Sequence, residues 1–111
     1  MAQSNYARPT DADWTPTDPG VRRRIHAFND ELMIVEFAFE KGAEGYLHAH
    51  PHVQASYVAR GSFEVTIAGH TETLGAGQSF VVPSGAIHGV RALEDGLLVD
   101  SFTPARQDFL K

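Results

Sequence analysis

Cysteine is absent from this sequence of 111 residues. Its absence excludes a disulfide framework, a zinc finger, a thiol nucleophile and an iron–sulfur site. If the protein binds a metal ion, the ligands have to be side chains other than thiolates, such as imidazoles and amides.

An excess of positive charge is also missing. Nine basic and 14 acidic side chains give a formal charge of −5, which argues against a nucleic-acid partner.

Long apolar runs are missing too. The longest, residues 32–35, is interrupted by Glu36, whereas a membrane helix needs about 20 apolar residues. Because the N-terminus lacks the charged-then-apolar pattern of a signal peptide, we expect a cytoplasmic protein without membrane partners.

The first 20 residues differ from the rest in composition. They contain three prolines and several Asp and Thr residues, so we expect an N-terminal arm over residues 1–20 without regular structure, attached to the body by Trp14. The length allows one core of useful size. We therefore expect one domain over residues 21–111, which includes a C-terminal tail.

A sustained 3.6-residue apolar period is absent as well, so helices should be short and terminal. Alternating apolar residues and glycine- or proline-containing turns predict strands from residue 21 onward. The clearest strand candidates are residues 32–40, 46–60 with a bend at Pro51, 63–67, 79–82, 87–91 and 97–102. Eight or nine short strands of this kind predict an all-β fold, either a closed barrel or a two-sheet jelly roll.

Histidine is over-represented, with six residues in 111. His48, His50 and His52 alternate, and residues two apart on an extended strand point to the same side. Gln54 has the same parity, and His88 follows a Pro-x-Gly turn. Clustered neutral imidazoles in a β protein typically hold a first-row transition metal. Surface histidines on an edge strand are the alternative.

These residues resemble the two sequence motifs of the cupins. The first motif, Gly-x5-His-x-His-x3-Glu-x6-Gly, matches at Gly42, His48, His50 and Gly61, with Gln54 where Glu is usual. The second, Gly-x5-Pro-x-Gly-x2-His-x3-Asn, matches at Gly77, Pro83, Gly85 and His88, with Ala92 in place of Asn. The resemblance implies a single small cupin barrel (a jelly roll, or double-stranded β-helix) whose metal ligands are His48, His50, Gln54 and His88.

Gln54 in place of Glu bears on the chemistry. Without a carboxylate ligand, the charge of a divalent ion is not compensated by protein, which favours Lewis-acid chemistry over the oxidative iron chemistry of two His and a carboxylate. The metal itself stays open among Ni, Zn, Mn, Fe and Co.

A closer resemblance covers nearly the whole chain. Residues 48–54, 83–89 and 100–110, together with Trp14 and residues 20–23, are similar to the KdgF-type pectin-degradation cupins. The resemblance implies a metal-dependent enzyme that converts 4,5-unsaturated uronates from pectin or alginate to the linear keto sugar acid. It also implies that Asp100, Phe102 and Arg106 act in the site. Val53 departs from the family, where Glu often precedes the Gln.

The residues themselves leave alternatives open. Asp100 is either a buried carboxyl able to transfer protons or an ordinary strand-end Asp, Phe102 is either a substrate platform or core, and Arg106 is either a carboxylate clamp or a solvated tail residue. His52 is expected at the rim of the site or behind its ligands. Residues 22–24, an arginine triplet, are expected at a solvated strand edge or a dimer contact.

Other functions and the oligomeric state also remain open. A different metal-cupin enzyme, such as a dioxygenase or a small-acid isomerase, is one alternative, and a sugar-binding sensor without activity is another. A small barrel with exposed sheet edges is expected to form a homodimer.

Overall fold

A computed structural model describes residues 4–111 of the chain and shows ten strands with two short 3-10 helices. The strands are β1 (Thr15–Asp18), β2 (Val21–Phe28), β3 (Met33–Phe39), β4 (Glu44–His48), β5 (Val53–Arg60), β6 (Ser62–Ile67), β7 (His70–Gly75), β8 (Ser79–Val82), β9 (His88–Ala92) and β10 (Gly96–Thr103). The 3-10 helices are η1 (Pro9–Asp11) and η2 (Gln107–Leu110). Across residues 4–111 no helix is long and apolar enough to cross a membrane.

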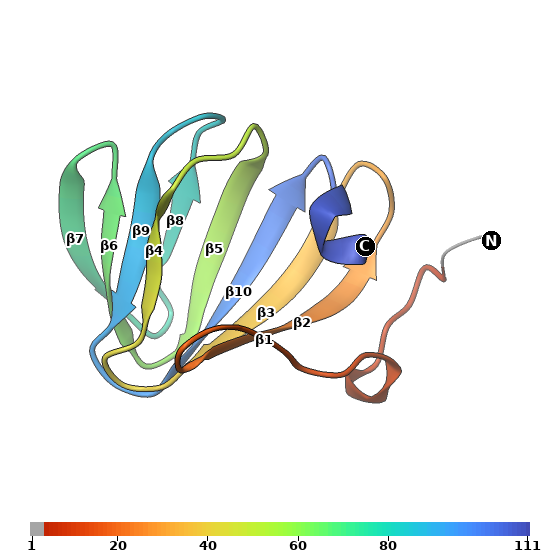
Figure 1. Ribbon diagram of the computed structural model, residues 1–111, viewed down its shortest axis with the longest axis horizontal. Coiled ribbons are helices and arrows are strands. Elements are labelled where there is room, and N and C mark those ends of the chain that lie inside the picture. The colour runs from red at the N-terminus through yellow and green to blue at the C-terminus, as the bar shows by residue number, and fades with distance from the viewer. Residues whose placement is uncertain (1–3) are drawn as a thin grey trace.

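The strands form two antiparallel sheets that face each other, as Figure 1 shows. One sheet has six strands in the order β1-β2-β3-β10-β5-β8, and the other has four in the order β4-β9-β6-β7. This is the jelly-roll arrangement, so the predicted all-β fold class is confirmed.

The predicted break at Pro51 is also confirmed, because β4 and β5 lie on either side of it and belong to different sheets. Proline cannot donate a ladder hydrogen bond, so the chain leaves one sheet there and enters the other. This crossing places the loop of residues 49–52 at one end of the barrel.

The arm does not fully match the prediction. Residues 1–3 lie outside the described part of the chain, but η1 and β1 give residues 9–11 and 15–18 regular structure, so the expectation of an arm without any is wrong. β1 pairs with β2 at the edge of the six-stranded sheet, where a proline such as Pro16 is tolerated. Trp14 docks as predicted, with the guanidinium groups of Arg22 and Arg24 4.7 and 4.3 Å from its ring centroid.

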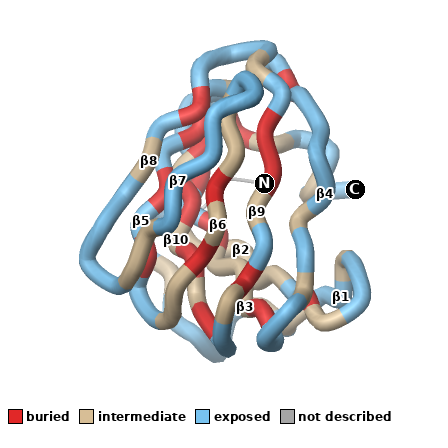
Figure 2. Tube along the Cα trace, turned by 90° about the vertical axis from the view of Figure 1, so that its left-hand side faces the viewer, coloured by how far each residue is buried: buried red, intermediate tan, exposed pale blue. Residues whose placement is uncertain are grey.

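The core lies between the sheets, and buried positions recur along the strands of both sheets (Figure 2). Phe63 and Val58 are fully buried at one end, in one apolar cluster. Met33, Val35 and Phe102 form a second cluster, nearer the C-terminal turn. Because strand residues alternate sides, Leu98, Asp100 and Phe102 share one face of β10, and all three are buried, so the structure decides in favour of a buried Asp100.

One glycine of the first motif is required by packing. Gly61 has a φ of +82°, and a Cβ at this position would lie 2.6 Å from the Asp95 carbonyl oxygen. A side chain therefore meets both an unfavourable backbone conformation and a clash with backbone atoms. The tight turn between β5 and β6 depends on glycine for both reasons.

Candidate metal centre and adjoining cavity

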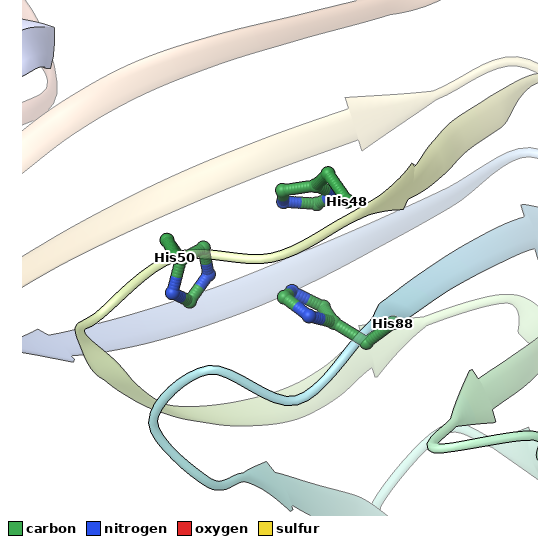
Figure 3. A group of neighbouring side chains, drawn as sticks. All are labelled: His48, His50 and His88. Carbon is green, nitrogen blue, oxygen red and sulfur yellow. The ribbon is translucent and has the colours of Figure 1, made fainter.

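Three imidazoles converge at one end of the barrel, as Figure 3 shows. His48 ends β4, His50 follows it in the loop before Pro51, and His88 begins β9 on the neighbouring strand. One ring nitrogen from each lies within 4.8 Å of the others, and the ring centroids of His48 and His88 are 4.4 Å apart. Three nitrogen donors at this spacing could hold one metal ion.

A backbone hydrogen bond fixes the orientation of each ring. In each case Nδ1 donates to the carbonyl oxygen of a residue two positions away in the sequence. The partners are Tyr46 for His48 at 2.7 Å, His52 for His50 at 3.0 Å and Ala86 for His88 at 3.0 Å. Since Nδ1 carries the proton, Nε2 keeps its lone pair, which is the arrangement of metal-binding histidines.

Two loops keep the histidines in place. The N–H of Gly85 donates to the carbonyl oxygen of His50 at 2.9 Å, and the Ser84 hydroxyl donates to the carbonyl oxygen of Pro51. The Pro-x-Gly turn of the second motif therefore binds the loop of the first. This contact joins segments more than 30 residues apart in the sequence.

Gln54 extends the cluster with an oxygen. Its Nε2 donates to Ser56 Oγ at 3.0 Å and to Asp100 Oδ2 at 3.3 Å. These bonds turn Oε1 toward the histidines, where it lies 3.0 Å from His50 Nε2. With the proton of His50 on Nδ1, two acceptors face each other at this distance, and a shared cation removes their repulsion.

An unpartnered ring nitrogen and the burial of two imidazoles also favour a metal ion at the cluster. His88 Nε2 is buried and has no hydrogen-bond partner among residues 4–111. Burial lowers the pKa of both His50 and His88, which favours the neutral, ligating imidazole. The donor set of three imidazoles and one amide therefore fits a divalent first-row transition metal. The prediction that His48, His50, Gln54 and His88 are ligands remains a prediction.

Asp100 lies directly behind Gln54. It is 4 % exposed, and its Oδ1 is buried without a hydrogen-bond partner in the described part of the chain. Burial raises the pKa of Asp100 to about 7, and the nearby Ser56 hydroxyl and the positive charge of Arg106 only partly offset that effect. The carboxyl group can therefore hold or release a proton near neutral pH.

A cavity of about 320 Å³ adjoins the cluster. Its lining includes His48, Gln54 and His88 at the cluster, together with Asp100, Phe102 and Arg106. The structure thus brings six of the seven predicted site residues to one cavity. The seventh, His50, lies beside the cavity, where its Nε2 faces Oε1 of Gln54. The volume suits a small molecule.

Phe102 has a packing role that is visible in the structure. It is 2 % exposed, belongs to the core cluster of Met33 and Val35, and lines the cavity. Its ring centroid lies 5.8 Å from that of His50 in an edge-to-face arrangement. Phe102 therefore supports a predicted ligand from behind while presenting part of its surface to the cavity.

The guanidinium group of Arg106 is already paired with a carboxylate of this chain, so it is not free to bind that of a substrate. Its Nε and Nη2 donate to the two carboxylate oxygens of Asp108 at 3.1 and 2.9 Å. Its guanidinium group also lies 4.2 Å from the ring centroid of Phe109. The side of the guanidinium group that pairs best with a carboxylate is thus already occupied within the chain.

Two further predicted positions lie apart from the ligand set. His52 accepts the hydrogen bond of His50 through its backbone, and its ring lies 5.6 Å from that of His50 between centroids. Val53 is exposed, on the opposite side of β5 from Gln54. A side chain at position 53 therefore does not face the cluster.

Arg23 is a cavity residue that the sequence did not single out. The sequence predicts a solvated edge or a dimer contact for the arginine triplet; the solvated edge is wrong for Arg23, which is half-buried and lines the cavity, while the dimer contact remains a prediction. The only signal was its parity, since Arg22 and Arg24 point to the other side of β2, toward Trp14.

Comparisons with known proteins agree with this geometry. Residues 35–99 match the Cupin domain family model. The chain is 42 % identical over 107 residues to the pectin degradation protein KdgF of Dickeya dadantii (strain 3937), covering 95 % of this chain and 97 % of that protein.

Solved structures give the same result. An RmlC-like cupin from Shewanella frigidimarina NCIMB 400 is 44 % identical, with a TM-score of 0.92 over 98 % of this chain and 99 % of that one. KdgF from Halomonas sp. is 39 % identical, with a TM-score of 0.90 over 96 % and 98 % of the two chains.

Proposed function

The chain belongs to the Cupin domain family, and from this we propose that it is a metal-dependent enzyme acting on 4,5-unsaturated uronates from pectin or alginate, which it converts to the linear keto sugar acid. One observation carries the proposal: a single cavity joins the histidine cluster to the buried carboxyl group of Asp100. Similarity to proteins named KdgF supports the substrate class.

In this proposal His48, His50, His88 and Gln54 hold a divalent ion. Their inward Nε2 atoms and the Gln54 Oε1 are the donors. Lewis-acid polarisation of the sugar's oxygen atoms is the chemistry that such an ion would supply when bound. The lack of a carboxylate among these four residues leaves the charge of the ion undiminished, which suits that chemistry better than oxygen activation.

The proposed reaction is an isomerisation. The C1 hydroxyl of the cyclic uronate loses its proton, and the bond between C1 and the ring oxygen breaks to give an aldehyde and an enol. A proton added at C4 and the loss of the enol proton then give the ketone at C5. Substrate and product have the same composition, so no oxidant or reductant is needed.

Asp100 is the proposed proton carrier. Its Oδ1 makes no hydrogen bond to residues 4–111, while Oδ2 is held by Gln54. One oxygen is thus anchored, and the other is buried beside the cavity without a partner among the described residues. A positioned carboxyl group of this kind typically contributes about 10²- to 10⁴-fold in rate.

The remaining cavity residues orient the substrate and exclude water. Phe37, Phe102 and Phe109 line the cavity, and their rings give it apolar walls from which a bound sugar would displace water. Arg106 adds positive charge beside an acidic sugar, and Asp108 holds its guanidinium group in place. A partly dry site strengthens each of these electrostatic interactions.

The test is conversion of the unsaturated galacturonate monomer. Its conjugated double bond absorbs in the ultraviolet, and loss of that absorbance is followed with chelator-treated protein and with protein reloaded with Ni, Zn, Mn, Fe or Co. We expect reloading to accelerate conversion and Asp100→Asn to slow it at least about 100-fold. Asp13→Asn, on the exposed arm, is the matched control.

Two results would overturn the proposal. One is a conversion rate with reloaded protein that equals the uncatalysed rate. The other is oxygen consumption with this substrate, which would indicate a dioxygenase. Full activity of Asp100→Asn would instead remove Asp100 from the proton path.

A further inference from the structure

Arg23 occupies an unusual position for an arginine. It lies within β2, directly across from Phe37 of β3, on the side of the strand that faces the cavity. Arg22 and Arg24 on either side of it contact Trp14 on the other side of the sheet. The strand alternation therefore directs one charge of the triplet toward the proposed substrate.

The guanidinium group of Arg23 is held but not paired. It lies 3.9 Å from the ring centroid of Phe109, which also packs against Arg106 at 4.2 Å. Stacking on an aromatic face orients a guanidinium plane. No carboxylate within residues 4–111 forms an ion pair with Arg23, although Asp18 and Asp100 also line the cavity.

The guanidinium groups of Arg23 and Arg106 thus both stack on the ring of Phe109, but only Arg106 is paired with a carboxylate. Asp108 binds Arg106 through both of its oxygens. Burial and the neighbouring Arg106 lower the pKa of Arg23, and Asp108 only partly offsets them. A partly desolvated cation without a partner is unfavourable, and an anion entering the cavity would remove that cost.

We propose that Arg23 binds the carboxylate of the sugar acid and so makes the cavity selective for acidic over neutral sugars. The identity of this ligand rests on the proposed function. Arg23 is preferred to Arg106 because its donors are not committed to Asp108. A guanidinium group matches a carboxylate through two parallel hydrogen bonds.

The first test is direct binding, measured by calorimetry on metal-loaded protein. The probes are galacturonate and galactose, which differ in the carboxylate. We expect the wild type to prefer galacturonate and Arg23→Gln to weaken galacturonate binding about 10- to 100-fold, with galactose binding unchanged. Arg23→Lys should keep part of the preference for galacturonate, since lysine has the positive charge but not the planar guanidinium group that makes two parallel hydrogen bonds.

Arg22→Gln is the matched control. It removes the same charge from the adjacent position, on the side of β2 that faces Trp14, so it should keep the preference. Circular dichroism and thermal melting establish that each variant is folded. In turnover of the unsaturated galacturonate, Arg23→Gln should raise KM by a similar factor and leave kcat little changed.

The outcomes separate this proposal from the proposed function. A folded Arg23→Gln that still prefers galacturonate overturns the role of Arg23, and so does a wild type that binds neither probe. Loss of the preference in Arg106→Gln but not in Arg23→Gln overturns it as well. If the wild type shows an Arg23-dependent preference without converting the unsaturated sugar, the enzyme proposal fails and the carboxylate site stands.

Discussion

Replacing Asp100 with Asn should stabilise the metal-free protein at alkaline pH. The carboxyl group is 4 % exposed, and burial raises its pKa from 3.8 to about 7. A group whose pKa is raised by folding contributes stability that is fully present below its unfolded pKa and is lost as pH rises through its folded pKa. The wild type therefore loses stability between about pH 4 and pH 7 because of this residue.

The size of the effect follows from the shift. A change from 3.8 to about 7 is roughly three pKa units, and each unit corresponds to about 1.4 kcal/mol. At pH 8 the ionised carboxylate thus costs the folded state about 4 kcal/mol, and at pH 4 less than about 1 kcal/mol. Asn has the same shape without the charge, so Asp100→Asn should approach this gain at pH 8 and show little difference at pH 4.

Urea unfolding of chelator-treated protein at pH 4, 6 and 8 measures this. The transition midpoint of Asp100→Asn should exceed that of the wild type increasingly with pH. Asp108→Asn is a control of opposite sign: the Arg106 hydrogen bonds lower the pKa of Asp108, so its loss should destabilise the protein at pH 8 more than at pH 4. A stability difference between Asp100→Asn and wild type that does not change with pH would refute the reasoning.

Three further predictions address the metal, the backbone and the assembly. A divalent metal at about 100 times its Kd should stabilise the wild type by about 2.7 kcal/mol in thermal unfolding. His88→Ala should abolish most of that gain, and an equal gain in both proteins would exclude His88 as a ligand. Gly61→Ala should destabilise the fold by more than about 1 kcal/mol and by more than Gly77→Ala. Both glycines have positive φ, but of the two only Gly61 would place a Cβ against neighbouring atoms, 2.6 Å from a backbone oxygen. Equal melting temperatures for the two variants would contradict this. The expected homodimer should sediment at about twice the 12.1 kDa chain mass, and a species of one chain mass at all concentrations tested would disprove it.

Much of the fold and of the candidate site was predictable, because it follows from short-range rules. Side chains alternate along strands, and Pro51 and the motif glycines mark the turns, so strand positions and the parity of Gln54 and Asp100 can be read locally. The motif spacing also indicated which histidines converge. His48 and His50 on one segment and His88 on another do lie together in the structure.

Other features were not predictable because the alternation of apolar and polar residues does not say which neighbouring groups will pair, even when the partners are close in the sequence. The arm gains strand β1 only because the edge of β2 is available for pairing. The sequence left Arg106 open as a carboxylate clamp or a solvated tail residue, and in the structure its guanidinium group instead pairs with Asp108, which the C-terminal turn places beside it. Local periodicity contains no information on either contact.

The sequence by itself determined the all-β class, the cupin motifs and the residues that form the histidine cluster, since each is encoded by spacing along one or two strands. Only the tertiary structure decided which side of each strand faces the cavity. That choice depends on how the two sheets pack, and it buried Asp100, exposed Val53 and turned Arg23 inward beside Phe109. The missing cysteines leave the predicted site intact, because three imidazoles and an amide could supply its ligands without a thiolate.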